Sequence, residues 1–160
     1  MTTFAIRPAT PADVPVIFDL IRQLSVYEKL EHMVTGTTAM LHDNLFGARP
    51  SCECLMAEED GQPIGFALYF TTFSTFLCQP GLYLEDLFVV PNARGKGFGK
   101  ALLKELARIA RQRNCGRFEW RVLDWNEPSI QFYKSLGATI MPEWYLVRMT
   151  GPEIDLLASS

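Results

Sequence analysis

Apolar residues near the start of the chain recur three or four positions apart, which is typical of a helix with one buried face. They are Val14, Ile17, Phe18, Ile21 and Leu24. Thr10 is placed to cap this helix, with Pro11 at its first position and Asp13 able to return the capping bond. A short strand is expected before it, over Phe4 to Arg7. A second helix is expected over Thr37 to Phe46, with its inward positions at Met40, Leu41 and Leu45.

The middle of the chain has the pattern of strands. Residues 52–59 and 62–70 are joined at Asp60-Gly61, a hairpin turn signal. No charged side chain occurs from Gln62 to Leu84, but several hydroxyl side chains and a Pro-Gly pair argue against a membrane span. The pattern predicts a strand to about Phe70, then an apolar loop, then a strand over 82–90. The loop holds Phe73, Phe76 and Leu77, which could line a substrate channel, form a subunit contact or belong to the core.

The second half of the chain alternates helices and strands. A helix after residue 99 is expected to bury Leu102, Leu103, Leu106, Ile109 and Ala110. A strand over Phe118 to Val122, a helix over Glu127 to Leu136 and a last strand over Trp144 to Met149 follow. With no internal repeat or linker in 160 residues, the chain is expected to form a single domain over 1–160, a mixed sheet with helices on its faces.

Composition narrows the classes of partner. Apolar residues make up 48% of the chain and charged residues 21%, as in globular proteins. The formal net charge of −3 argues against a nucleic-acid or anionic-membrane partner. The four cysteines form no Cys-x-x-Cys pair and only two histidines are present, so no metal site is predicted. Cysteine usage and an N-terminus without the apolar core of a signal peptide predict a cytoplasmic protein.

One segment carries most of the chemical information. The apolar run Leu87 to Val90 leads into a turn at Pro91-Asn92, then Arg94-Gly95-Lys96-Gly97-Phe98-Gly99, then an amphipathic helix. Glycines let backbone N–H groups close around an anion, and a helix N-terminus favours negative charge, so this segment predicts a phosphate cradle. The spacing fits neither a Walker loop nor a dinucleotide-binding fingerprint. A tight glycine turn without a ligand is the remaining alternative.

The order Arg-Gly-x-Gly-x-Gly after an apolar strand resembles the diphosphate loop of the GNAT acetyltransferases. Residues 122–138, with Asn126 and the run Phe132-Tyr133-Lys134-Ser135-Leu136-Gly137, resemble the second signature of that family, and Ile6 to Thr10 its opening strand. In detail, Tyr83-Leu84-Glu85-Asp86 and Trp125 to Ile130 resemble the diamine branch, which includes the spermidine/spermine and thialysine acetyltransferases. The resemblance implies an α/β fold (an α+β mixed sheet), mostly antiparallel, with six to seven strands, splayed central strands and about four helices.

The resemblance also implies a coenzyme site, for acetyl-CoA as co-substrate and without a metal. Backbone groups of Leu87, Phe88 and Val89 would pair with the pantetheine arm, and Asn126 would contact the coenzyme from the other side of the splay. The diphosphate would be held by Arg94, Gly95, Lys96, Gly97, Phe98, Gly99 and Lys100.

Amine acetylation needs a base for an ammonium with a reference pKa of about 10.4, donors for an oxyanion, and a proton for the leaving thiolate. Tyr133 is the expected acid, because a phenol can protonate a thiolate and the family's motif tyrosine matches it. Glu85 is the expected base, although it could instead hold the cation. A backbone N–H of residues 87–89 would meet the oxyanion. The alternative for Tyr133 is an aromatic residue packed beside Phe132.

The substrate is the least constrained part. Tyr27 and Glu28 match a substrate contact of the diamine branch, and Glu143 matches another with different local spacing. The loop Phe73-Ser74-Thr75-Phe76 resembles the thialysine type. The expected reaction is acetyl transfer to a primary amine of a thialysine-like or lysine-like molecule, a diamine or a polyamine, by direct attack in a ternary complex. Alternatives are acetylation of a protein or peptide, and a non-catalytic acetyl-CoA sensor. The family's habit implies a homodimer.

Overall fold

A computed structural model describes residues 3–160 of the chain. The chain divides into two compact units, Met1–Arg121 and Val122–Ser160. The single domain expected over 1–160 stays a prediction.

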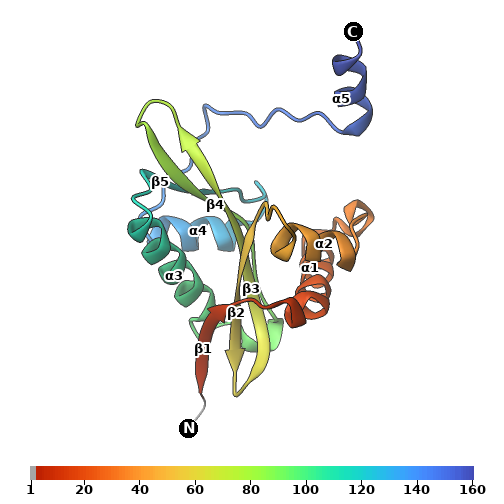
Figure 1. The fold of residues 1–160 in the computed structure, drawn as a ribbon. Helices are drawn as coiled ribbons and strands as arrows, with labels where there is room; N and C mark the ends of the chain where they lie inside the picture. The colour runs from red at the N-terminus through yellow and green to blue at the C-terminus, as the bar shows by residue number, and fades with distance from the viewer. Residues whose placement is uncertain (1–2) are drawn as a thin grey trace. The chain divides into compact units, whose positions relative to one another are not determined.

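The first unit is built on a sheet of five strands among the described residues, in the order β1-β2-β3-β4-β5. The strands are β1 (Phe4–Pro8), β2 (Glu53–Glu59), β3 (Gln62–Ser74), β4 (Gln79–Val89) and β5 (Arg117–Trp120). The first four pair in antiparallel fashion, and β5 joins β4 in parallel. Figure 1 shows helices α1 (Val14–Glu28) and α2 (Thr38–Phe46) on one side of this sheet and α3 (Phe98–Gln112) on the other. The predicted mixed, mostly antiparallel sheet with helices on its faces is confirmed.

The core of the first unit follows the predicted apolar positions. On the α1 side, Ile17 and Leu20 pack in one buried cluster with Met56, Phe66 and Phe88 of the sheet. On the other side, α3 buries Leu102, Leu103, Leu106 and Ala110, as its spacing predicts, together with Phe98. Three 3₁₀ helices, over Pro11–Asp13, Glu31–Met33 and Pro91–Ala93, complete the connections.

The predicted helix starts are confirmed, with one error in the inward positions. The capping box of Thr10 and Asp13 is present, and Arg7 donates to both carboxylate oxygens of Asp13, at 2.7 and 2.8 Å. Thr37 caps α2 by accepting from the N–H of Met40. The inward position predicted for Met40 is wrong, because its side chain is 57% exposed while Leu45 is buried. In a helix of nine residues only one face reaches the core.

The hairpin of β3 and β4 is longer than the sequence predicts. Pairing continues from Thr71 opposite Leu82 to Ser74 opposite Gln79, so the loop shrinks to residues 75–78. Threonines tolerate extended backbone well, and the ladder satisfies their backbone groups. Phe73 and Phe76 lie near the tip of this hairpin, 64% and 95% exposed, so they are not part of the core.

β4 and β5 stop pairing about halfway along β4. β5 pairs only with Gly81 to Leu84, while β4 runs on to Val89. Within residues 3–121, β4 therefore has an open edge over residues 85–89. The N–H of Val90 donates to the carbonyl of Ile64 on β3. Since backbone direction alternates along a strand, Phe88 also faces β3, whereas Leu87 and Val89 face the open edge. β5 itself ends at Trp120, so the predicted splay of the central strands stays a prediction.

The second unit, described by itself, holds α4 (Glu127–Ser135) and α5 (Gly151–Ala158). The strand predicted over Trp144 to Met149 is wrong, because these residues are exposed and pair with no strand among the described residues. A strand requires a neighbour's backbone, which local sequence cannot guarantee. The described sheet consequently has five strands, not six or seven.

α5 was not predicted, although its capping box of Thr150 and Glu153 with Pro152 was a usable signal.

Gly65 controls how closely β3 approaches the end of β4. A Cβ atom at this position would lie 2.5 Å from the carbonyl oxygen of Phe88 and 3.3 Å from Cα of Val89. Replacing Gly65 with alanine should therefore push the strands apart and lower the free energy of unfolding by about 1–3 kcal/mol. Gly36→Ala is the control, because nothing lies within 4 Å of its Cβ position. Urea unfolding measures both variants, and equal midpoints would contradict the prediction.

Candidate active site

The glycine loop forms an open concave turn after β4. Gly95 and Gly97 have φ angles of 79° and 89°, a left-handed backbone that side chains other than glycine disfavour. No atom lies within 4 Å of a Cβ built on either glycine, so the loop is open to a ligand. Alternating backbone of this kind turns successive N–H groups inward and binds anions. The left-handed glycines and the open space beside them are compatible with the predicted phosphate cradle, which stays a prediction.

The N-terminus of α3 continues the same surface. Its first intrahelical hydrogen bond runs from the N–H of Ala101 to the carbonyl of Gly97, at 3.0 Å. The N–H groups of Phe98, Gly99 and Lys100 therefore precede the helix's own hydrogen bonding. The side chain of Phe98 is buried and stacks on Phe4 with ring centroids 4.5 Å apart. Phe98 thus fixes the helix start, and only its backbone could reach an anion.

The cationic side chains of the loop differ in their surroundings. Nζ of Lys96 lies 2.9 and 3.0 Å from the two carboxylate oxygens of Glu59 at the end of β2. Lys100 is exposed in the first turn of α3. Arg94 is bound to the protein: its Nε donates to the carbonyl of Val89 at 2.9 Å. An anion in the cradle would meet the helix N-terminus and Lys100 first.

Three carboxylates gather at the other end of the open edge. Glu85 and Asp86 begin this stretch of β4, and Glu28 ends α1. Glu85 is exposed, whereas Asp86 is half-buried. Burial raises the pKa of Asp86 to about 6, and repulsion from Glu85 and Glu28 adds to this shift. Burial also raises the pKa of Glu28. The site therefore holds concentrated negative charge, which a cation would relieve.

Asp86 is the residue that sequence reasoning missed. Its neighbour Glu85 was preferred as the base on resemblance, but Glu85 is paired with Arg121, with Nη2 at 3.2 and 3.4 Å from its carboxylate oxygens. A carboxylate whose pKa is raised toward neutrality is better suited to accept a proton. Only the three-dimensional arrangement of α1 against β4 creates this environment, so no local signal could have identified it.

The predicted residues of the second unit lie on and near α4. Asn126 is buried and caps this helix, its side-chain oxygen accepting from the N–H of Ser129 at 3.4 Å. Tyr133 follows in the last turns, half-buried, with its ring 5.5 Å from that of Phe132. The spacing of seven residues in a helix places Asn126 and Tyr133 on one side. Glu143 lies in an exposed segment without regular structure.

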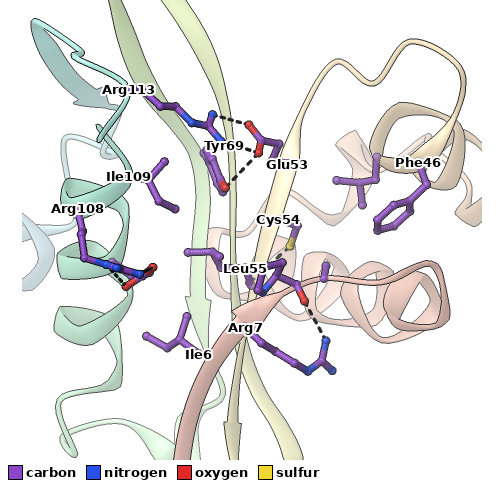
Figure 2. A pocket seen from close by; sticks show the side chains of 14 residues that line it. Ile6, Arg7, Phe46, Glu53, Cys54, Leu55, Tyr69, Arg108, Ile109 and Arg113 are labelled. Atoms are coloured by element: carbon purple, nitrogen blue, oxygen red, sulfur yellow. Dashed lines mark hydrogen bonds and ion pairs between the residues drawn. The ribbon is translucent and has the colours of Figure 1, made fainter. Parts of the chain in front are cut away.

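A pocket of about 510 Å³ lies elsewhere in the first unit, between β1, β2 and α3 (Figure 2). None of the predicted site residues lines it. Figure 2 shows Arg113 reaching from beyond α3 to Glu53, which it binds through two nitrogens at 2.6 and 2.8 Å. Glu105 is likewise paired with Arg108. Because these carboxylates are already neutralised, the pocket is poorly suited to a cationic amine.

Two further properties of residues 3–160 bear on partners. No group of three or more histidine, cysteine, aspartate or glutamate side chains is arranged to hold a metal ion in this range. Within the same range, no helix combines the length and apolar character needed to cross a bilayer.

Comparisons with known proteins agree on one family. Residues 20–138 match the model of the Acetyltransferase (GNAT) family. The chain is 36% identical to a thialysine N-epsilon-acetyltransferase from Sus scrofa, over 99% of each protein. It is 32% identical to an L-ornithine N5-acetyltransferase from Arabidopsis thaliana, over 95% of this chain and 86% of that protein. Among solved structures, an integron cassette protein from V. cholerae matches with a TM-score of 0.81 and 29% identity, over 98% of each chain.

The raised pKa of Asp86 predicts a pH-dependent stability. The folded state binds the Asp86 proton more tightly than the unfolded state does, so this contribution to stability is present below pH 4 and lost as the pH rises through 6. Asp86→Asn removes the buried charge and should stabilise the protein at pH 8 by roughly 1–3 kcal/mol, with the gain vanishing near pH 4.

The control for this prediction is Glu85→Gln, which neutralises the neighbouring, exposed carboxylate. It loses a surface ion pair worth roughly 1 kcal/mol or less. It also removes one source of the repulsion on Asp86, so any gain in stability at high pH should be smaller than that of Asp86→Asn. Denaturant unfolding of the three proteins between pH 4 and 8 gives the comparison. A stability difference between Asp86→Asn and wild type that does not change with pH would refute the assignment.

Proposed function

The chain belongs to the GNAT acetyltransferase family, and we propose that it transfers the acetyl group of acetyl-CoA to a primary amine of a small cationic molecule. The observation that carries this proposal is the open edge of β4, which leads directly into the glycine cradle at the N-terminus of α3. The names of the relatives, a thialysine and an ornithine acetyltransferase, support amines of amino-acid size. The amine would attack directly in a ternary complex.

The first unit offers groups that fit the coenzyme. The open-edge backbone of Leu87 and Val89 would pair with the amides of the pantetheine arm, as an added strand does. The backbone groups of Phe88 face β3 and its side chain is buried in the core, so Phe88 would support the strand from inside rather than contact the coenzyme. The turn from Arg94 to Lys100 would hold the diphosphate through its N–H groups, with the charge of Lys100 beside them. When bound, acetyl-CoA supplies a thioester that is already activated toward an amine.

The acidic end of the open edge would receive the amine. Asp86 and Glu28 would attract the ammonium group, and Tyr27 beside Glu28 would line the approach. We propose that Asp86 shares the role of base with Glu85, because the raised pKa of Asp86 suits it to take the ammonium proton. Arg121 holds the Glu85 carboxylate in place. A backbone N–H at Leu87 or Val89 would face the developing oxyanion.

The second unit holds two residues for which the resemblance implies a role in the reaction. Tyr133 is proposed as the acid that protonates the leaving thiolate, and Asn126 as a contact to the coenzyme. Both lie toward one side of α4, which supports a joint role. Glu143 is proposed as a further substrate contact, on resemblance alone.

We further propose a homodimer in the cytoplasm. Apolar side chains are exposed both at the hairpin tip, at Phe73 and Phe76, and in the segment around Trp144 and Val147. Exposed apolar groups of this size favour association. The four cysteines are free thiols, which is typical of a reducing compartment.

The proposed acid gives a direct test of catalysis. Tyr133→Phe removes only a hydroxyl group, and kcat should fall by about 10²–10⁴-fold if that group protonates the thiolate. Tyr145→Phe is the matched control, because it is the same change at an 89% exposed tyrosine. Thiol release from acetyl-CoA with an amine panel measures both. Unchanged turnover in Tyr133→Phe would exclude the acid role, and no turnover by wild type with any amine would favour a sensor.

The number of carboxylates predicts the choice of amine. The acidic groups of the proposed amine site lie close together, so a long polycation would leave some of its ammonium groups without a carboxylate partner. One short cation would lose no such contact. We expect kcat/KM to be higher for thialysine or ornithine than for spermidine, by about tenfold or more for each lost carboxylate contact worth roughly 1.5 kcal/mol. Competition assays with acetyl-CoA measure this ratio directly. A clear preference for spermidine would refute the proposed substrate class.

A further inference from the structure

Arg94 has an unusual position for a residue expected to bind a diphosphate. Its side chain turns back from the loop toward α1. The guanidinium carbon lies 4.8 Å from the ring centroid of Tyr27 and 5.3 Å from that of Phe88. Its Nε also donates to the carbonyl of Val89 at 2.9 Å. One side chain thus touches the last turn of α1 and the end of β4, and it also begins the coenzyme loop.

We propose that Arg94 is a positioning residue that couples the coenzyme loop to Tyr27, so that coenzyme binding and amine binding support one another. This inference rests on the proposed function, because it assigns the loop to the coenzyme and the end of α1 to the amine. The coupling passes through a contact between a cation and an aromatic ring face, which is attractive.

The loop needs such an anchor because of its glycines. Arg94 closes the 3₁₀ helix Pro91–Ala93, and two residues with left-handed backbone, Gly95 and Gly97, follow closely. Glycine loses more conformational freedom on ordering than any other residue. An arginine fixed at the start of the loop therefore reduces the entropy that binding an anion must overcome.

The other end of the contact is also held firmly. Lys29 ends α1 with a left-handed φ of 62°, and the N–H of Leu30 donates to the carbonyl of Ser25 at 2.8 Å. This cap fixes the last turn of α1, which carries Tyr27 and Glu28 side by side. Glu28 interacts electrostatically with Asp86. The last turn of α1 therefore holds both Tyr27, which contacts Arg94, and Glu28, which interacts with Asp86.

Two assignments of Arg94 make different predictions. If Arg94 is only a ligand of the diphosphate, Tyr27 should have no influence on coenzyme affinity. If Arg94 is a positioning residue, removing the Tyr27 ring should weaken coenzyme binding even when no amine is present. If the coenzyme strengthens amine binding through this contact, linkage requires that the amine strengthen coenzyme binding by the same factor.

The test is calorimetry of free coenzyme A binding to wild type, Tyr27→Leu and Tyr27→Phe. Tyr27→Leu removes the ring face and should weaken binding by about two- to fivefold, as expected for a cation–ring contact between two exposed side chains. Tyr27→Phe keeps the ring face and should bind within about twofold of wild type. If Tyr27→Phe binds the coenzyme as wild type does, the ring and not the hydroxyl group is responsible for the effect on affinity.

A double-mutant cycle with Arg94→Gln identifies the route of the effect. If the influence of Tyr27 passes through Arg94, Tyr27→Leu should weaken binding no further in the Arg94→Gln background. General damage to the end of α1 would weaken binding equally in both backgrounds and would overturn the inference. So would a Tyr27→Leu affinity equal to that of wild type. Absence of coenzyme binding by wild type would instead overturn the proposed function.

Discussion

The backbone of β4 imposes the constraint on which the rest of the site depends. Over residues 85–89 it is hydrogen-bonded on one side only among the strands of the first unit, because β5 pairs with it no further than Leu84. Backbone N–H and C=O groups that are removed from water need partners. A strand whose edge is left open in the middle of a sheet is therefore a binding surface for anything that carries amide groups in an extended chain.

The charged side chains of β4 and of the loop after it differ in sign at the two ends of the open edge, although Arg121 pairs with Glu85 and Glu59 pairs with Lys96. Carboxylates lie where the open stretch begins, at Glu85 and Asp86, and cations lie just after it ends, from Arg94 to Lys100. Asp86 and Val90 are separated by roughly 13 Å, since a strand rises about 3.3 Å per residue. A single strand thus presents opposite potentials to an anionic and a cationic reactant, and it brings their reacting ends together between the two charged groups.

Local sequence patterns predicted most of the fold. They failed where contacts with residues outside the segment determine whether a strand forms and where it ends. The capping box of Thr10, the hairpin at Asp60-Gly61 and the apolar face of α3 depend on neighbours within a few residues, and all are present. Residues 144–149 have strand-like composition but no strand beside them in the described chain. The limits of β3 and β4 depend on their mutual pairing, so the loop between them was predicted too long.

The same distinction between local and distant determinants applies to the candidate site. The glycine cradle is recognisable in the sequence because its geometry comes from glycine itself and from the helix that follows. The chemistry of Asp86 cannot be recognised in the sequence, because its raised pKa comes from burial and from Glu28, which lies on another element. Arg94 shows most clearly what the sequence alone does not predict. An arginine beside three glycines suggests a phosphate ligand, yet its surroundings, a carbonyl and two ring faces, make it part of the frame that shapes the loop.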